Sequence, residues 1–329
     1  MTRQIQNDTP ARRLFLILSP RSLDYARLSI SSLFANAAEN LHLHLITDSD
    51  EDKQTLITEL QLGSIPTRHQ ASVYAEEELA DLEADRFGRY PNLRQFRHGH
   101  PCWRKITDPL LLTEDGEEMV LLDPDLYFPN PFAFEPTPSS GILLMWQKPT
   151  CFMRPDQVRI AMDKGIRLAD HIDIGVGHWR APIDLDWLEW LLSQLDFASL
   201  RRYMHMEAFV WSALAMHLGG GHLDPAYWHC WQFSIPRRLR LKFGSPKMSL
   251  VGTDNFPALK CFHAGGLAKY WITEAHQAGL LNTPQQTHIE PGRILPFIEL
   301  QPSAFKREQK MKAMLGKLGY YTFFRQYGS

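Results

Sequence analysis

Several features that mark other classes of protein are missing from this sequence of 329 residues. Its apolar runs are short, such as residues 14–18, whereas a membrane-spanning helix needs about 18 apolar residues. Residues 1–10 are polar and contain no apolar signal-peptide core. No periodic repeat runs through the chain, which argues against collagen-like, coiled-coil and low-complexity proteins.

Cysteine is scarce. The four residues Cys102, Cys151, Cys230 and Cys261 are far apart, and none belongs to a C-x-x-C pair. This pattern argues against a zinc ribbon, a redox pair and a secreted disulfide scaffold. We therefore expect a reducing, cytoplasmic location.

A large excess of charge is also missing, because the formal net charge is −2 and 44% of the residues are hydrophobic. These values exclude global disorder, and a chain of this length can bury a full core. The charge is uneven, however. Residues 306–329 hold six basic residues and one acidic residue, a net of +5, which leaves −7 for the rest. An acidic body gives no support to nucleic-acid binding, so no such partner is expected.

The sequence does contain an alternation of apolar strands and helical segments. Strands are predicted at 13–19, 41–47 and 71–74, and helices at 25–38, 51–60 and 76–86. This order is typical of a mostly parallel sheet with helices on both faces. We expect an α/β fold whose ligands bind beyond the carboxyl ends of the strands.

Later segments continue this pattern. A basic loop is expected at 86–100, followed by helices at 103–112, 184–195 and 204–217, strands at 118–122 and 141–146, and a strand or turn at 171–178. Residues 222–260 give no clear pattern. The main domain is expected to span residues 11–290, with a basic C-terminal tail at 291–329.

The D-x-D pattern recurs in the chain. Asp48-Ser-Asp50 and Asp184-Leu-Asp186 precede helices, where acidic residues act as caps. Asp123-Pro-Asp125 instead ends an apolar strand directly. Two close carboxylates in such surroundings are costly without a cation, and together they can ligate one hard divalent cation. We therefore predict metal binding by this pair.

A second motif contains His263, a glycine pair ending at Gly266, and Lys269. Glycine allows a phosphate to approach the backbone closely, and a lysine supplies the countercharge. The alternative interpretation is a turn with a core histidine and a solvated lysine.

The string His263-x-x-Gly266-x-x-Lys269-x-Trp271 resembles the H-x-x-G-x-x-K-x-W signature of family 8 glycosyltransferases, the glycogenin and bacterial galactosyltransferase group. Asp123-Pro-Asp125 resembles that family's D-x-D. The segment starting at Trp103 resembles the preceding helix, whose basic residue contacts the donor; Lys105 or Arg104 would be that residue. The likeness extends over residues 13 to about 275.

Three further segments carry the resemblance less closely. Ile172-Asp-Ile-Gly-Val176 resembles an N-[SA]-G-V strand, with Asp173 where asparagine is usual. Ser19 and Tyr25 lie where the family's uridine-binding segment begins. The family's helical Asp-Gln pair has no full counterpart, because Glu207 takes the acidic position without a following glutamine and an alternative alignment places His205 there.

The resemblance implies a GT-A (Rossmann-like) nucleotide-diphospho-sugar transferase. It would move a hexose from a nucleotide sugar, with UDP favoured, to a hydroxyl on a glycan, lipid-linked or protein acceptor, with retention. Asp123, Asp125 and His263 would bind Mn²⁺ or Mg²⁺, a Lewis acid for the leaving diphosphate. The implied catalytic residues are Glu207 and Asp173, and the implied donor-binding residues are Ser19, Tyr25, Lys105, Gly266 and Lys269.

Two other functions stay open. A sugar nucleotidyltransferase uses a similar sheet, but it should carry a glycine-rich basic loop after the first strand, where this chain has Ser19-Pro-Arg-Ser-Leu-Asp24. A catalytically inactive carbohydrate-binding relative is the second alternative, and the presence of both metal motifs argues against it.

The tail has an apolar stripe with helical spacing, formed by Met311, Met314, Leu315 and Leu318. A basic amphipathic helix of this kind can lie on an anionic membrane surface. Many bacterial enzymes of the resembled family build surface glycans on lipid-linked acceptors. Peripheral contact with the inner face of the membrane is therefore one expectation, and a terminal helix docked on the body is the other.

Overall fold

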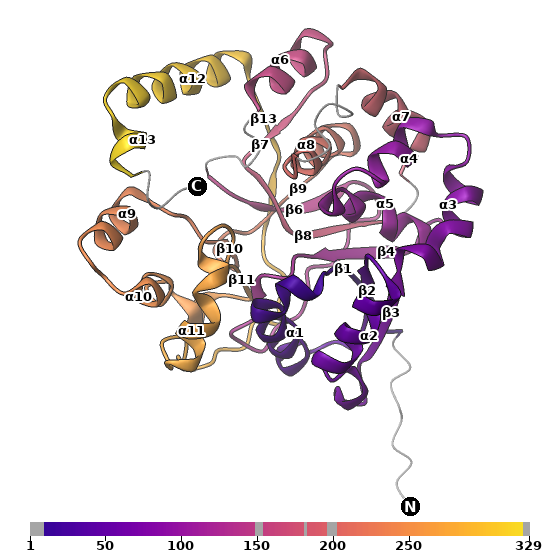
Figure 1. The fold of residues 1–329 in the computed structure, drawn as a ribbon, viewed down its shortest axis with the longest axis horizontal. Helices are drawn as coiled ribbons and strands as arrows, with labels where there is room; N and C mark the ends of the chain where they lie inside the picture. Colours follow the sequence, from indigo (N-terminus) through magenta and orange to yellow (C-terminus); the bar gives the residue numbers. More distant parts are fainter. Residues whose placement is uncertain (1–9, 149–153, 181–182, 196–202, 325–329) are drawn as a thin grey trace, which may run out of the picture.

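The computed structural model describes residues 10–148, 154–180, 183–195 and 203–324, and it confirms the predicted α/β fold (Figure 1). In this part of the chain, eleven strands form one sheet whose main path runs β3-β2-β1-β4-β8-β6-β10-β11-β5. Its strands are β1 (Arg12–Ile17), β2 (Leu41–Thr47), β3 (Gln70–Ala75), β4 (Glu118–Leu122), β5 (Leu126–Tyr127), β6 (Ile142–Trp146), β8 (Ile172–Arg180), β9 (Gly220–Leu223), β10 (Trp228–Cys230), β11 (Cys261–His263) and β12 (Ile294–Pro296). A separate pair consists of β7 (Ala169–Asp170) and β13 (Ile298–Glu299).

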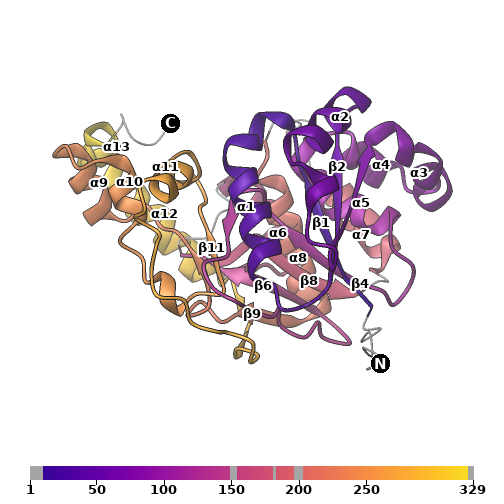
Figure 2. The same cartoon turned by 90° about the horizontal axis from the view of Figure 1, so that it is seen from below.

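Helices lie on both faces of this sheet (Figure 2). The α-helices of the described residues are α1 (Leu23–Asn36), α2 (Asp50–Glu59), α3 (Ala80–Phe87), α4 (Pro91–Arg97), α5 (Arg104–Leu111), α6 (Pro155–Asp163), α7 (Leu185–Gln194), α8 (Met206–Leu218), α9 (Ile235–Lys242), α10 (Lys247–Val251), α11 (Ile272–Gln277), α12 (Pro302–Lys317) and α13 (Tyr320–Phe323), of which α9, α10, α12 and α13 lie to one side of the sheet. One buried core joins α1 and α2 to the sheet, and another joins α4, α5, α7 and α8 to its opposite face. A third lies around β11, α10 and α11.

The parallel half of the sheet contains a reversal of strand order. β1 is parallel to β2 on one side and to β4 on the other. The chain therefore leaves β1 towards β2 and β3 and returns across β1 to form β4. In open α/β sheets, ligands bind in the crevice beyond the carboxyl ends of the strands at such a switch point.

The other half of the sheet is mixed. β8 is antiparallel to both β4 and β6, whereas β10 is parallel to β6 and β11. The two-residue strand β5 pairs antiparallel with β11 and places His263 opposite Leu126. This pairing brings the end of β11 against the segment that follows β4.

The predicted loop at 86–100 is wrong in part, because this segment contains helix α4. Glu189 of α7 accepts hydrogen bonds from the backbone N–H groups of Asn92 and Leu93, at 3.0 and 2.9 Å, and so satisfies the first turn of α4. This partner lies almost a hundred residues away, so the local sequence gives no sign of it.

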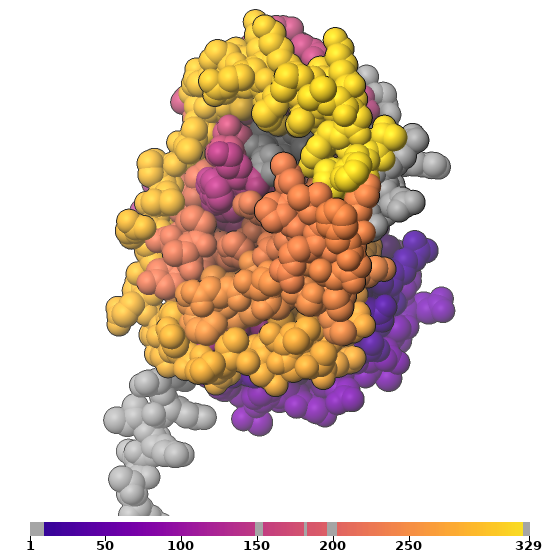
Figure 3. Space-filling model, turned by 90° about the vertical axis from the view of Figure 1, so that its left-hand side faces the viewer, coloured from indigo at the N-terminus to yellow at the C-terminus, as the bar shows by residue number. Residues whose placement is uncertain are grey.

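Beyond residue 290, β12 pairs with β9 and β13 pairs with β7 before α12 begins. Figure 3 shows α12 and α13, in yellow, beside the orange segment that contains α9. Lys242 of α9 donates a hydrogen bond of 2.8 Å to the carbonyl of Phe323. Among the described residues, no helix is long and apolar enough to cross a bilayer.

Candidate metal and donor site

Three predicted metal ligands converge at the carboxyl edge of the sheet. His263 Nε2 lies 3.2 Å from Asp125 Oδ1 and 3.7 Å from Asp123 Oδ2. Each of the three residues is less than one tenth exposed. One atom from each lies within 4.8 Å of the others, so a single cation can contact all three side chains.

Backbone pairing places these side chains. Ala264 N–H donates to the Asp125 carbonyl at 2.9 Å, next to the pairing of β5 with β11. Asp123 N–H donates to the Gly175 carbonyl at 2.8 Å, which ties β8 to the end of β4. A Cβ atom at Gly175 would lie 2.6 Å from His263 Nδ1, so only glycine leaves space for the imidazole in this position.

Asp173 lies behind the histidine. Its Oδ1 accepts a hydrogen bond of 2.7 Å from His263 Nδ1 and one of 2.9 Å from Gly175 N–H. Burial alone would lower the pKa of His263, but the carboxylates of Asp173 and Asp125 raise it well above its ordinary value. A carboxylate in this place orients the ring and directs Nε2 towards the aspartate pair.

Lys105 and Glu207 adjoin the same cluster. Lys105 Nζ lies 2.5 Å from Asp123 Oδ1 and donates to Glu207 Oε1 at 2.9 Å. The other oxygen of Glu207, Oε2, is buried and has no hydrogen-bond partner among the described residues. Burial raises the pKa of Glu207 to about 8, with Lys105 opposing this shift and Asp123 adding to it.

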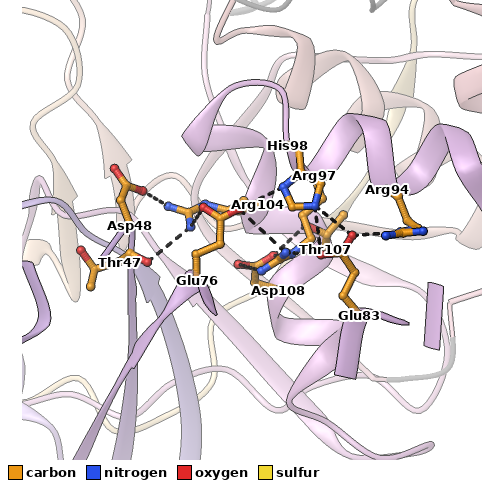
Figure 4. Close-up of polar contacts among 10 residues, drawn as sticks. All are labelled: Thr47, Asp48, Glu76, Glu83, Arg94, Arg97, His98, Arg104, Thr107 and Asp108. Atoms are coloured by element: carbon orange, nitrogen blue, oxygen red, sulfur yellow. Dashed lines mark hydrogen bonds and ion pairs between the residues drawn. The ribbon is translucent and has the colours of Figure 1, made fainter. Parts of the chain in front are cut away.

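Arg104, the alternative donor contact, has different partners (Figure 4). Its guanidinium donates to Glu76 at 3.0 Å and also pairs with Asp48, in a polar pocket at the carboxyl ends of β2 and β3. Lys105 is therefore the basic residue of α5 beside the aspartate pair. The capping role expected for Asp48 is wrong, since Ser49 is the N-cap of α2; Asp184 does cap α7.

The other predicted donor-binding residues follow β1 and β11. Lys269 Nζ lies 5.6 Å from the centre of the Tyr25 ring, in the range of a cation–π contact. Burial works to lower the pKa of Lys269, but Asp125 and Tyr25 raise it overall. Gly266 has a φ of +66°, a left-handed conformation that favours glycine. Ser19 caps the turn after β1, where it accepts a long hydrogen bond of 3.4 Å from Arg21 N–H.

Sequence reasoning missed Cys230. Its Sγ lies 3.5 Å from Asp173 Oδ2 and 3.8 Å from His263 Nδ1. The pairing of β10 with β11 sets Cys230 opposite His263. The residues of β10 fall in the stretch without a clear pattern, so only the strand register identifies this neighbour.

The side chains of this cluster are suited to bind a divalent cation. Asp123, Asp125 and Asp173 are buried carboxylates that meet Lys105 and protonated His263, whereas the raised pKa of Glu207 leaves that side chain neutral near pH 7. This balance leaves an excess of negative charge that a divalent cation would neutralise. Carboxylate oxygens with one imidazole nitrogen suit Mn²⁺, and Mg²⁺ accepts the oxygen ligands.

Searches for relatives give a limited result: no protein-family model and no curated protein matches the chain. Similar solved structures include mouse xyloside xylosyltransferase 1, at 13% identity over 78% of this chain and 99% of that chain, with a TM-score of 0.44. The glycosyltransferase GlyE of Streptococcus pneumoniae has 13% identity over 83% of this chain and 61% of that chain, with a TM-score of 0.42.

The galactosyltransferase LgtC, in complex with donor and acceptor sugar analogues, has 12% identity over 83% of this chain and 97% of that chain, with a TM-score of 0.41. Similarities this low do not assign an activity to the chain. Its function therefore has to follow from the buried cluster itself.

Proposed function

We propose that this protein is a metal-dependent glycosyltransferase. It moves a hexose from a UDP-linked sugar to a hydroxyl acceptor, with retention of configuration at the anomeric carbon. The observation that carries the proposal is the buried cluster of Asp123, Asp125 and His263 at the carboxyl edge of the sheet. The diphosphate of a nucleotide sugar is a dianion that needs a cation at this point. Ligands of open α/β sheets bind beyond the strand ends at such a strand reversal, which supports binding of the nucleotide there.

In this proposal, Asp123, Asp125 and His263 hold Mn²⁺ or Mg²⁺, which stabilises the charge of the leaving diphosphate as a Lewis acid. Lys269, half-buried beside Tyr25, pairs with the diphosphate from the side of α1. Lys105 neutralises Asp123 on the side away from His263.

The proposed catalytic residues have two different tasks. Asp173 keeps the imidazole of His263 in place through its 2.7 Å hydrogen bond. Glu207 presents Oε2, a buried oxygen with no partner among the described residues, which would hydrogen-bond a sugar hydroxyl, as a donor while the carboxyl is protonated and as an acceptor once it is ionised. A site built to bond a hydroxyl discriminates strongly against a sugar that lacks it.

The tail is proposed to give peripheral membrane contact on the cytoplasmic side. Met311 and Met314 of α12 and its C-cap residue Leu318 are 51%, 54% and 73% exposed and Leu315 is half-buried, so the body of the described structure leaves most of this stripe uncovered. Basic residues beside such a stripe attract anionic lipid. This arrangement favours a glycan acceptor that is linked to lipid.

The test is release of UDP from a panel of UDP-hexoses, measured with Mn²⁺ and with EDTA. Asp125→Asn should abolish the Mn²⁺-dependent release, because it removes one ligand charge. The matched control is Asp186→Asn, which changes an exposed aspartate of another D-x-D motif. Release that persists at the wild-type rate in EDTA would contradict the proposal, and a panel of GDP sugars tests the choice of base.

A further inference from the structure

A second group of metal-ligating atoms lies on the opposite edge of the His263 ring. It consists of Cys230 Sγ, an Asp173 carboxylate oxygen and His263 Nδ1, all within 4.8 Å of one another. Cys230 is 3% exposed, Asp173 4% and His263 6%. Cys230 has no part in the proposed transfer reaction, so its place in this group requires a separate explanation.

The two distances from Cys230 are close to those of a tetrahedral zinc site, and the 2.7 Å hydrogen bond between His263 Nδ1 and Asp173 Oδ1 would have to widen as a cation replaces its proton. With Zn–S of about 2.3 Å and Zn–N or Zn–O of about 2.0–2.1 Å, neighbouring ligand atoms lie roughly 3.3–3.6 Å apart. Cys230 Sγ lies 3.5 Å from Asp173 Oδ2 and 3.8 Å from His263 Nδ1. Two of the ligands are on paired strands, β10 and β11, and Asp173 lies on β8. Only small side-chain movements are needed to bind a cation.

We propose that Asp173, Cys230 and His263 form a second cation site, selective for thiophilic ions such as Zn²⁺ and Cd²⁺, that competes with the cation on Asp123 and Asp125. A thiolate, an imidazole and a carboxylate favour Zn²⁺ over Mn²⁺. Three protein ligands leave the fourth position to water.

The two cations would compete because each needs one of the two nitrogens of the His263 imidazole. When the thiophilic cation binds, the thiol proton of Cys230 and the Nδ1 proton of His263 pass to solvent. The proton on Nε2 then stays directed at Asp125, 3.2 Å away. A protonated nitrogen has no lone pair to offer, so His263 cannot ligate the cation on the aspartate pair at the same time. This exclusion rests on the proposed function, whereas the existence of the second site does not.

The test uses the full-length protein and Cd²⁺, whose thiolate complexes absorb in the near ultraviolet. Wild-type protein should develop one cadmium–thiolate band per chain, and Cys230→Ser should lose it and bind Zn²⁺ at least tenfold more weakly by calorimetry. Cys230→Ala replaces the serine variant if that variant does not fold. The matched controls are Cys102→Ser and Cys261→Ser, which remove the other described thiols and should keep the band.

A band that persists in Cys230→Ser, or that disappears in a control variant instead, would overturn the proposal. The outcome is separable from that of the proposed function. A wild-type protein that binds UDP with Mn²⁺ but shows no Cd²⁺ band disproves only the second site. A band without Mn²⁺-dependent UDP binding disproves only the glycosyltransferase proposal.

Discussion

The ion pair between Lys260 and Glu135 should be essential for stability. Both side chains are 1% exposed, and Lys260 Nζ lies 2.8 Å from Glu135 Oε1. The ammonium also donates to the carbonyls of Ala133 and Glu290, at 3.1 and 2.8 Å, so all three of its protons have partners. Glu135 in turn accepts from the indole of Trp228 at 2.9 Å. Because Lys260 directly precedes β11, this network also anchors the strand that carries His263.

Lys260→Met would leave the Glu135 carboxylate buried without a countercharge. Removing one partner of a buried pair costs about 3–5 kcal/mol. An unfolding entropy of about 2.1 cal/mol/K per residue gives roughly 0.7 kcal/mol/K for this chain, so the melting temperature should fall by about 4–7 °C. Replacing Glu135 with Gln as well should recover part of this loss, because the unpaired charge is removed.

Urea and thermal unfolding followed by circular dichroism measure both effects. The single and double variants are compared with wild type under identical conditions. A loss below about 1 kcal/mol for Lys260→Met would match an exposed ion pair and refute the buried network.

Three further predictions follow from the site and the core. Lys269→Ala should weaken UDP binding roughly ten- to a hundredfold, because a charged hydrogen bond contributes about 1.5–3 kcal/mol; unchanged calorimetric affinity would exclude a diphosphate contact. Burial lowers the pKa of His44 to about 3, so this residue stays neutral in the folded state while the unfolded chain takes up a proton below about pH 6.5. The free energy of unfolding should therefore fall by about 2 kcal/mol as the pH drops from 7 to 5, because of this residue. His44→Asn should flatten that part of the profile of urea midpoint against pH, and an unchanged slope would contradict the low pKa of His44. Deleting residues 306–329 should abolish sedimentation with anionic liposomes, for which neutral liposomes are the reference, while UDP release continues. A truncated chain that does not fold would show that the tail is part of the folded body and would contradict a separate membrane contact.

Much of the fold could be predicted because its signals are local. The strand predicted at 41–47 is β2 and the one at 118–122 is β4, since apolar residues concentrate there and polar residues end each strand. It was harder to predict which residues of a strand face solvent and which are buried. His42 and His44 alternate with leucines, which indicates a polar face of the strand. His44 is nevertheless buried and stacks on Phe15, with the two ring centroids 4.9 Å apart. β2 lies between β1 and β3 with helices on both faces, so alternation does not imply contact with solvent.

The candidate site divides in the same way. Asp123, Asp125 and His263 were recognisable from motifs, because each motif gives residue types suited to a cation at a strand end. Their meeting depends on the two-residue strand β5, which no local pattern predicts. The contacts of Lys105 with Glu207 join residues about a hundred positions apart and need the packing of α5 against α8.

The most direct test of the central claim is the thermal shift that UDP produces with Mn²⁺ and with EDTA. At a hundredfold excess over Kd, binding should add about 2.7 kcal/mol of stability, or roughly 4 °C for a chain of this size. The account predicts this shift for wild type with Mn²⁺, and its loss in EDTA and in Asp125→Asn. An equal shift in EDTA, or an undiminished shift in Asp125→Asn, would contradict a cation-dependent nucleotide site at Asp123, Asp125 and His263.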